Sequence, residues 1–393
     1  MKILMVNTLY APYKIGGAEK SVQLLAEELA AKGHEVTVAT LHDNVEIESI
    51  HMNGVNVVRF PLKNIYWPYT EKHSFIRRCV WHINDIYNKK MLSLVAGYFA
   101  KNEFDVVHTN NLTGFSVAIW TWAKNREIPI VHTSRDYSLI HPNGTLFKKG
   151  RNMDPLCLES RLYSFIKKQI SNNVSVYVGI SDYIKKVHVQ TGFFQKSENT
   201  VIYNSITANQ CVKRHGSDKI VLGYLGRIEE EKGVEVLLNA LSKLRGMEIK
   251  IAGKGSEDYI KYLNEKYSSI SMSFLGVVNA SDFFPQIDYL IVPSMWNEPL
   301  GRVVLEAASF GIPSIGSAKG GIPEIIKDRH TGYIFNSESQ LIDVLNIIND
   351  KSKDDYFSMS KNVWGYSLQF DSGLIVDKYT RAYELARISR NKR

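Results

Sequence analysis

Two glutamates in the C-terminal half of the sequence flank the expected start of one helix. Glu298 lies in a polar loop after the apolar run 289–292, and Glu306 lies inside a helix expected from about Gly301. Backbone N–H groups at such a helix start point toward the carboxyl ends of the strands, where open α/β sheets bind ligands. Carboxylates placed there can accept hydrogen bonds from sugar hydroxyl groups. The alternative for Glu306 is a solvated helix face, which the apolar residues around it disfavour.

A pair of cations follows the first apolar run of the same half. Arg227 comes directly after the run 220–226, and Lys232 lies five residues later at the expected entrance of a helix. Two such cations can neutralise a diphosphate, both when it is bound and when charge grows on it as a leaving group. The alternative is two surface cations in a glutamate-rich turn, and the spacing alone does not choose between these interpretations.

Two further turns contain adjacent glycines, which let backbone N–H groups approach a phosphate closely. They lie at 14–19, after the first predicted strand, and at 319–324. Neither contains the full GxGxxG pattern, so each is weak when taken alone. The sequence lacks GxxxxGK[ST], HExxH, GxSxG and an evident DxD-like metal site. These absences disfavour P-loop nucleotide hydrolysis, zinc proteolysis and the common serine hydrolase mechanism.

Short β-branched runs alternate with amphipathic helical stretches along most of the chain. This alternation is typical of βαβ units, in which helices cover both faces of a parallel sheet. The sequence therefore predicts an α/β fold with two Rossmann-like domains in tandem. The predicted parts are an N-terminal domain at 1–204, a polar linker at 205–219, a C-terminal domain at 220–371, and a final helix with a basic tail at 372–393.

The composition restricts the partners and the compartment. The 393 residues are 44% hydrophobic and 22% charged, which is typical of ordinary globular proteins. The formal net charge of +8 favours anionic partners such as nucleotides, phospholipid headgroups or nucleic acid. Three widely spaced cysteines exclude a disulfide scaffold and a cysteine-rich zinc module, and they suit a reducing compartment.

No stretch of the sequence predicts a membrane-spanning helix. The longest nearly apolar stretch, 91–100, is about half of the roughly 20 residues that such a helix needs. The apolar start 1–6 is too short for the core of a signal peptide and predicts a first strand. We therefore expect a cytoplasmic protein.

The segment 74–101 mixes arginines and lysines with large apolar residues. One interpretation is a basic amphipathic helix on an anionic membrane surface. The other is a helix whose apolar stripe faces the sheet and whose charges are solvated. We favour the second interpretation, because an apolar helical stripe is far more often core than membrane anchor.

The ordered set of motifs closely resembles the retaining nucleotide-sugar glycosyltransferases of family 4. The resemblance covers nearly the whole chain, and it implies the GT-B architecture, in which two Rossmann-like domains face each other across an interdomain cleft. The motifs that carry it are Gly16–Glu19, Gly226-Arg227 with Lys232-Gly233, Ile251–Gly255, the pair of Glu298 and Glu306, and Gly320–Glu324.

The resemblance implies roles for residues of the C-terminal domain. Arg227 and Lys232 would bind the donor diphosphate, Glu306 the ribose hydroxyls, and Glu298 the transferred sugar. The remaining donor-binding residues implied by the resemblance are Gly253, Leu300 and Gly301, together with Gly17 of the N-terminal domain.

The acceptor would bind mainly to the N-terminal domain, with Gly16, His108, His132 and Asp136 on the acceptor side. One position departs from the family pattern, because Arg135 stands where the family usually has a histidine. Arginine is always charged and only donates hydrogen bonds, so it cannot act as a general base. We expect Arg135 to face the interdomain cleft and to bind a substrate oxygen. The alternative is a head group that points out of the cleft.

These residues and the resemblance predict a retaining, metal-independent glycosyltransferase of the hexosyltransferase type. It would move a sugar from a nucleotide diphosphate donor such as a UDP-sugar to a hydroxyl group of a saccharide or lipid-linked acceptor, in the synthesis of a cell-surface polysaccharide. No cofactor and no nucleic acid partner are expected. An anionic membrane surface, at which the protein would be peripheral, is a partner only under the first interpretation of the segment 74–101. The alternatives are a nucleotide-sugar 2-epimerase of the same fold and a catalytically inactive sugar-binding scaffold.

Overall fold

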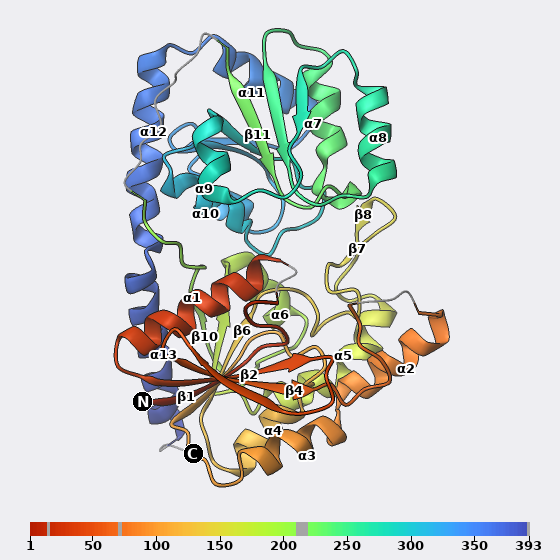
Figure 1. Cartoon of the computed structure of the whole chain (residues 1–393), viewed down its shortest axis with the longest axis vertical. Helices are drawn as coiled ribbons and strands as arrows, with labels where there is room; N and C mark the ends of the chain where they lie inside the picture. The colour runs from red at the N-terminus through yellow and green to blue at the C-terminus, as the bar shows by residue number, and fades with distance from the viewer. Residues whose placement is uncertain (14–15, 70–72, 210–218, 391–393) are drawn as a thin grey trace. The chain divides into compact units, whose positions relative to one another are not determined.

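The computed structural model describes residues 1–13, 16–69, 73–209 and 219–390, in two compact units (Figure 1). Unit 1 consists of Met1–Leu146, Asp154–Ser205 and Ser372–Arg393. Unit 2 consists of Phe147–Met153 and Ile206–Asp371. Most of the predicted linker, 210–218, lies outside the described residues.

Unit 1 is built on a twisted sheet whose described strands follow the order β10-β9-β6-β5-β1-β2-β4-β3. All neighbouring pairs are parallel except β3 and β4, as expected where helices connect the strands. The strands are β1 (Lys2–Val6), β2 (Glu35–His42), β3 (Glu48–Met52), β4 (Val55–Pro61), β5 (Val106–Thr109), β6 (Ile130–Ser134), β9 (Val176–Gly179) and β10 (Glu198–Val201).

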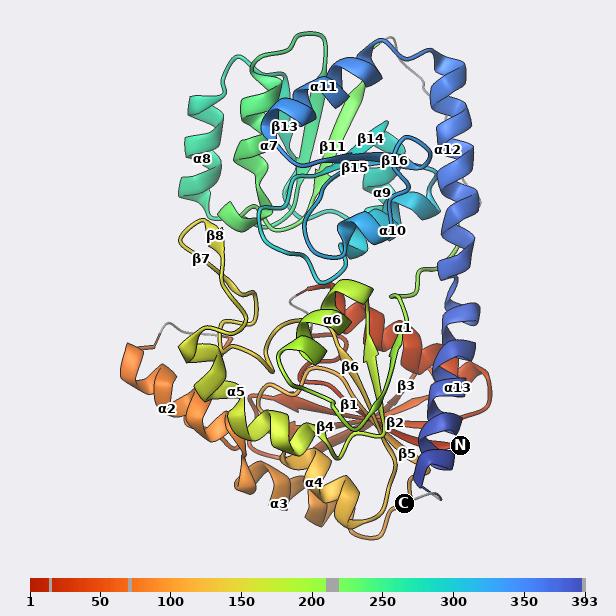
Figure 2. The ribbon, with the colours of Figure 1, turned by 180° about the vertical axis from the view of Figure 1, so that it is seen from behind.

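Helices lie on both faces of this sheet (Figure 2). The C-terminal helix α13 (Ser372–Arg390) packs against α1, β5, β6 and β9, and buries Tyr379 and Tyr383 in the core of unit 1. The final helix predicted from the sequence is therefore part of the first unit. The other helices are α1 (Gly17–Ala31), α2 (Phe75–Ile86), α3 (Lys89–Tyr98), α4 (Ala118–Asn125), α5 (Leu158–Ser171) and α6 (Asp182–Gln190).

The favoured interpretation of the segment 74–101 is wrong for its first helix. Helix α2 turns Trp81 and Asp85 inward, whereas Phe75, Ile76 and Ile83 lie 78%, 74% and 65% exposed. The apolar stripe has the expected helical spacing, but spacing does not specify which way a stripe points. Among the described residues, no helix is both long and apolar enough to cross a membrane.

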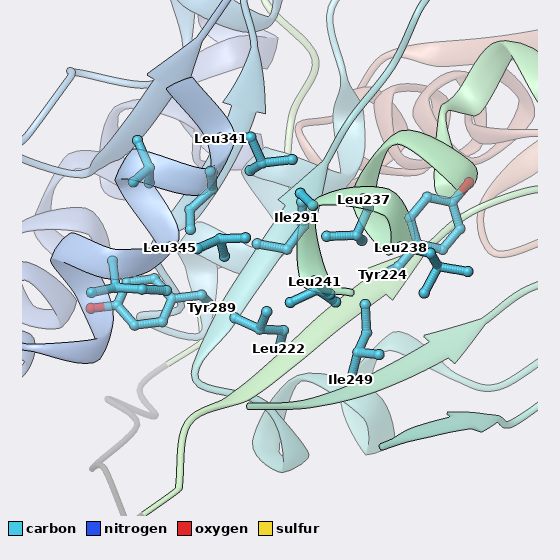
Figure 3. Close-up of a cluster of buried hydrophobic side chains, with 14 of the residues drawn as sticks. Leu222, Tyr224, Leu237, Leu238, Leu241, Ile249, Tyr289, Ile291, Leu341 and Leu345 are labelled. Atoms are coloured by element: carbon cyan, nitrogen blue, oxygen red, sulfur yellow. The ribbon is translucent and has the colours of Figure 1, made fainter. Parts of the chain in front are cut away.

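Unit 2 contains a second sheet, in which all described neighbours are parallel, in the order β13-β12-β11-β14-β15-β16. Leu222, Ile249 and Ile291 of its strands pack against Leu241 of α7 and Leu345 of α11 (Figure 3). The strands are β11 (Val221–Leu225), β12 (Glu248–Ala252), β13 (Met272–Phe274), β14 (Tyr289–Val292), β15 (Ser314–Ser317) and β16 (Gly332–Phe335). The helices are η1 (Glu230–Lys232), α7 (Val234–Leu241), α8 (Glu257–Lys266), α9 (Ala280–Phe283), η2 (Phe284–Gln286), α10 (Arg302–Ser309), η3 (Ile322–Glu324), α11 (Glu338–Asn349), α12 (Lys353–Ser367) and η4 (Leu368–Phe370).

A short hairpin leaves the first half of the sequence and joins unit 2. It consists of β7 (Phe147–Lys148) and β8 (Arg151–Asn152), which pair antiparallel. The predicted domain bounds assign this hairpin to the N-terminal domain and set 372–393 apart, whereas the contacts group both differently. Hydrophobic periodicity finds elements, but it does not show which core a polar hairpin or a last helix will contact.

Candidate functional site

Glu298, in the loop between β14 and α10, forms a largely buried ion pair with Lys232 of η1 in unit 2. Lys232 Nζ lies 2.7 Å from Glu298 Oε1, and Ser294 Oγ donates a hydrogen bond to the same oxygen at 2.8 Å. The Lys232 ammonium also lies 4.9 Å from the centre of the Trp296 ring. Burial by itself would raise the pKa of Glu298, but Lys232 and the hydrogen bonds from Ser294 and Trp296 hold it below its ordinary value. Glu298 is therefore a carboxylate at neutral pH.

Arg227 lies at the end of β11 and remains half-exposed. It forms an ion pair with Glu229, and a second guanidinium nitrogen lies 3.4 Å from Glu231 Oε1. Both sequence-predicted cations thus have carboxylate partners. Glu229 and Glu231 of the glutamate-rich turn hold Arg227, whereas Glu298 of the loop after β14 holds Lys232.

Glycines allow the backbone of this loop region to pack closely. Gly320 has φ +60°, and a Cβ atom there would lie 2.0 Å from the carbonyl oxygen of Glu298. Gly253 has φ +143°, and a Cβ atom would lie 1.7 Å from the carbonyl oxygen of Gly226. Any side chain at these two positions would push apart the turns that carry Glu298 and Arg227.

Helix α10 continues from this loop. Gly301 is its N-cap with φ +88°, Leu300 is buried, and Glu306 lies one turn beyond Arg302. Arg302 Nε donates to Glu306 Oε1 at 3.1 Å, which fixes the carboxylate on its helix. Arg302 was missed from the sequence, although opposite charges four residues apart on a helix are a readable signal.

Asn152 and Ser294 are also functional candidates that the sequence did not indicate. Asn152 Nδ2 donates to the carbonyl oxygen of Met295 at 3.0 Å, and its Oδ1 accepts from the Asn297 N–H at 2.8 Å. The hairpin β7–β8 thereby ties the loop that carries Glu298. In the same loop, the Ser294 carbonyl oxygen accepts a hydrogen bond from the Ser317 hydroxyl group.

Two predicted acceptor-side histidines lie in the core of unit 1. His108 Nδ1 shares a hydrogen bond with Tyr383 Oη at 2.9 Å, and its Nε2 shares one with Thr133 Oγ1 at 2.8 Å. His132 Nδ1 shares a hydrogen bond with Thr109 Oγ1 at 2.8 Å. Both rings are almost completely buried, and burial lowers the pKa of His108 to about 3 and that of His132 well below its ordinary value. These neutral, paired rings suit a structural role in unit 1.

Arg135 directly follows β6 and is held inside unit 1. Its Nε donates to Asn110 Oδ1 at 2.9 Å, and a terminal nitrogen donates to Asn204 Oδ1 at 2.6 Å. Arg135 is only 8% exposed, so its head group does not extend freely into solvent. The acceptors in both bonds are neutral amide oxygens.

The other predicted residues of unit 1 lie at strand ends or helix starts. Gly17 begins α1, and the Gly16 N–H donates to Glu19 Oε2 at 3.0 Å. Asp136 accepts hydrogen bonds from Asn111 Nδ2 and the Ser138 N–H, both at 2.8 Å. Burial raises the pKa of Asp136 despite these bonds.

A cavity of about 440 Å³ lies in unit 1 and is lined by aromatic, basic and polar residues. Thr113, which lines it, donates its backbone N–H to Asn111 Oδ1 at 2.9 Å, and Asn111 in turn bonds Asp136. The cavity is therefore connected to the carboxyl ends of β5 and β6, the edge at which such sheets bind ligands. Its lining comprises Tyr66, Pro68, Tyr69, His73, Arg78, Trp81, His82 and Thr113.

Two family models match the chain in succession. The model described as Glycosyltransferase Family 4 matches residues 15–210, and the model described as Glycosyl transferases group 1 matches residues 206–362. An uncharacterised 42.6 kDa protein in the cps region of Klebsiella pneumoniae is 40% identical over 326 residues, covering 83% of this chain and 87% of that protein. An uncharacterised glycosyltransferase of Methanocaldococcus jannaschii is 26% identical over 347 residues, covering 84% of each.

Solved structures resemble the fold over almost the full length. Sucrose-phosphate synthase from Thermosynechococcus elongatus has a TM-score of 0.78 at 18% identity, with 98% of each chain covered. The Anabaena protein HepE, solved in complex with UDP-glucose, has a TM-score of 0.71 at 18% identity, covering 98% of this chain and 99% of that one. At such identities the likeness concerns the fold alone, and it confirms the predicted α/β fold of GT-B type.

Proposed function

We propose that this chain, which belongs to the group 1 and family 4 glycosyltransferases, transfers a hexose from a nucleoside diphosphate donor to a hydroxyl group of a saccharide acceptor, with retention at the anomeric carbon. The observation that carries the proposal is the largely buried ion pair of Lys232 and Glu298, with Arg227 held near the neighbouring strand end. This arrangement provides cations for a diphosphate and a carboxylate for sugar hydroxyls within one unit.

The donor is proposed to be a UDP-sugar. Support comes from the HepE structure, which contains UDP-glucose on the same fold. Arg227 and Lys232 would neutralise the diphosphate, and Glu306, fixed by Arg302, would accept hydrogen bonds from the ribose hydroxyls. Gly17, Gly253 and the N–H groups of Leu300 and Gly301 remain proposed donor contacts.

The proposed reaction takes place on one face of the sugar. The acceptor oxygen bonds to the anomeric carbon while the bond from that carbon to the diphosphate oxygen breaks. The leaving diphosphate oxygen receives the acceptor proton, and Arg227 and Lys232 stabilise the charge that grows there. The reaction needs no metal ion in this proposal, because the two cations carry out that stabilisation.

The acceptor saccharide is proposed to bind the aromatic cavity of unit 1. Tyr66 and Tyr69 offer ring faces and hydroxyl groups, and Arg78 offers donors for sugar oxygens. The related Klebsiella protein lies in the cps region, which supports a surface polysaccharide as the product. In this proposal Asp136 and Arg135 stand near the acceptor, whereas His108 and His132 shape the sheet beneath it.

The test is a donor screen followed by transfer assays. The purified chain is incubated with UDP-sugars, alone and with a panel of oligosaccharides and lipid-linked saccharides, and the products are identified by mass spectrometry and NMR. A glycosyl product with the donor's anomeric configuration supports the proposal. Conversion of the donor alone into an isomer would identify an epimerase, and UDP-sugar binding without turnover on any acceptor would favour an inactive scaffold.

The role of Lys232 is tested beside a matched cation. Lys232→Ala should weaken UDP binding and cut transfer, because diphosphate charge is left unpaired in a partly desolvated site, and a charge-assisted contact is worth about 1.5 to 3 kcal/mol. Lys243→Ala removes an exposed lysine of the same unit, whose Nζ lies 2.7 Å from Glu338. Equal UDP affinity in both variants would contradict the assignment.

A further inference from the structure

Helices α2 and α5 contact each other and expose their apolar residues to solvent. Figures 1 and 2 show the two helices side by side along one side of unit 1. The exposed set forms what we call the α2–α5 face. It comprises Phe75, Ile76, Val80, Ile83, Leu158, Leu162, Phe165 and Ile166, with exposures from 43% for Val80 to 78% for Phe75.

The exposed residues form one stripe on each helix. Ile76, Val80 and Ile83 follow the i, i+4, i+7 spacing on α2, and Leu158, Leu162 and Phe165 repeat it on α5. Helix α5 reverses the usual arrangement, because its buried residues are three serines and a lysine. Single exposed apolar side chains are common, but eight of them on two helices that contact each other favour an interaction site.

The exposed charges of the two helices are mostly positive. Arg77, Arg78 and Arg161 are exposed beside the apolar stripes, and Glu159 is the one exposed acidic residue of the two described helices. Apolar side chains combined with cations fit the boundary between acyl chains and anionic headgroups. A symmetric pairing of two copies would bring the arginines of both copies into one interface, with only Glu159 of each copy to offset them.

We propose that the α2–α5 face binds an anionic lipid bilayer, with its apolar stripes among the acyl chains and its arginines at the phosphate groups. Both helices would lie in the plane of the interface without crossing it. Residues Arg78, Trp81 and His82 of α2 also line the aromatic cavity, so one helix carries both features. A lipid-linked saccharide could thus be held by its lipid near the cavity; this last step rests on the proposed function.

The test is co-sedimentation of the full chain with vesicles. Wild type should bind vesicles of phosphatidylglycerol and phosphatidylcholine at low salt and bind phosphatidylcholine alone weakly. The combined substitutions Phe75→Ser, Leu162→Ser and Phe165→Ser should lower binding at least tenfold. Arg77→Glu with Arg161→Glu should remove the preference for anionic vesicles. None of these residues lines the cavity or the ion-pair site.

Matched controls come from exposed apolar residues outside the face. Val45→Ser in unit 1 and Val277→Ser in unit 2 remove valines that are 84% and 78% exposed, and they should bind vesicles as wild type does. Transfer to a water-soluble acceptor should be equal in wild type and in the combined serine variant. If wild type does not transfer sugar to this acceptor either, the proposed function is contradicted, but the vesicle result still stands.

Three outcomes would overturn the bilayer proposal. One is absence of wild-type binding to anionic vesicles at low salt. Another is unchanged binding in the apolar and charge variants. The third is a wild-type dimer in light scattering that the serine variants convert to monomer without any vesicle binding, which would make the face an interface between copies.

Discussion

Glu298 is the residue for which the structure gives the sharpest prediction. Glu298→Gln keeps the side-chain shape and a hydrogen-bond acceptor for Ser294, but it removes the negative charge that pairs with Lys232. We expect transfer to fall at least tenfold while UDP affinity stays within about threefold of wild type, since losing a charged hydrogen bond costs roughly 1.5 to 3 kcal/mol. Calorimetric titration with UDP and initial-rate assays measure the two effects.

Glu306→Ala is the comparison variant for that prediction. It removes the carboxylate held by Arg302, so it should weaken UDP binding itself because the ribose is common to donor and product. Glu338→Gln, a change at an exposed partner of Lys243, is the neutral control. Equal losses of UDP affinity in Glu298→Gln and Glu306→Ala would refute the separate roles.

Arg135 gives a second prediction at the scale of one side chain. Its guanidinium bonds two asparagine oxygens, Asn110 and Asn204, from two separate segments. We expect Arg135→Ala to abolish transfer and leave UDP affinity unchanged, whereas Arg135→His keeps part of the activity with altered acceptor preference. If Arg135→Ala has the same melting temperature as wild type and transfers sugar at the same rate, Arg135 has a structural role alone.

The hairpin β7–β8 acts as one element on the loop that carries Glu298. Asn152→Ala removes both hydrogen bonds to that loop, so we expect kcat to fall about tenfold through misplacement of Glu298, with little change in KM for the acceptor. Asn152→Asp keeps the acceptor for the Asn297 N–H but loses the donor, and should give an intermediate kcat. Asn279→Ala, at an exposed position in unit 2, is the control. If the Asn152 variants have lower melting temperatures but an unchanged kcat, the positioning role is contradicted.

The elements were predictable where local pattern determines them. The apolar run 289–292 is β14, and the alternating run 248–252 is β12, because a short run between turns has few other ways to bury its apolar side chains. The orientation of α2 was not predictable, since the same spacing serves a core or an outside face. The contact of Asn152 with Met295 joins residues 143 positions apart, and no local signal announces it. Lys232 and Glu298 belong to the ordered set of motifs, so both could be predicted as residues of one site. Ser294 belongs to no motif and could not be predicted.

At the scale of the whole molecule, buried histidines make unit 1 sensitive to acid. Burial lowers the pKa of His188 to about 4 and that of His108 to about 3, whereas an unfolded histidine titrates near 6.5. Between these values the unfolded chain binds more protons, so stability falls as pH decreases below about 6.5. Each such histidine contributes roughly 1 kcal/mol of loss between pH 6.5 and 5.5. Burial raises the pKa of Asp85 despite the nearby Lys167, so this carboxyl group opposes part of the trend.

Urea unfolding at pH 7.5, 6.5 and 5.5 measures this dependence. His108→Gln should reduce the slope of stability against pH, because one buried titrating group is gone, even if its absolute stability is lower. His330→Gln, at an exposed position in unit 2, is the control variant. Identical slopes in wild type and His108→Gln would contradict the prediction.

Helix α13 has a consequence for the order in which the protein can be completed during synthesis. The chain passes through Ile206–Asp371 before it reaches α13, yet α13 supplies Tyr379 and Tyr383 to the core of unit 1. On the ribosome, all residues of unit 2 are therefore synthesised before α13, the helix that packs against the sheet of unit 1. Until α13 emerges, the side of the unit 1 sheet that it covers is exposed and can aggregate. Unit 1, whose synthesis begins first, is therefore completed last.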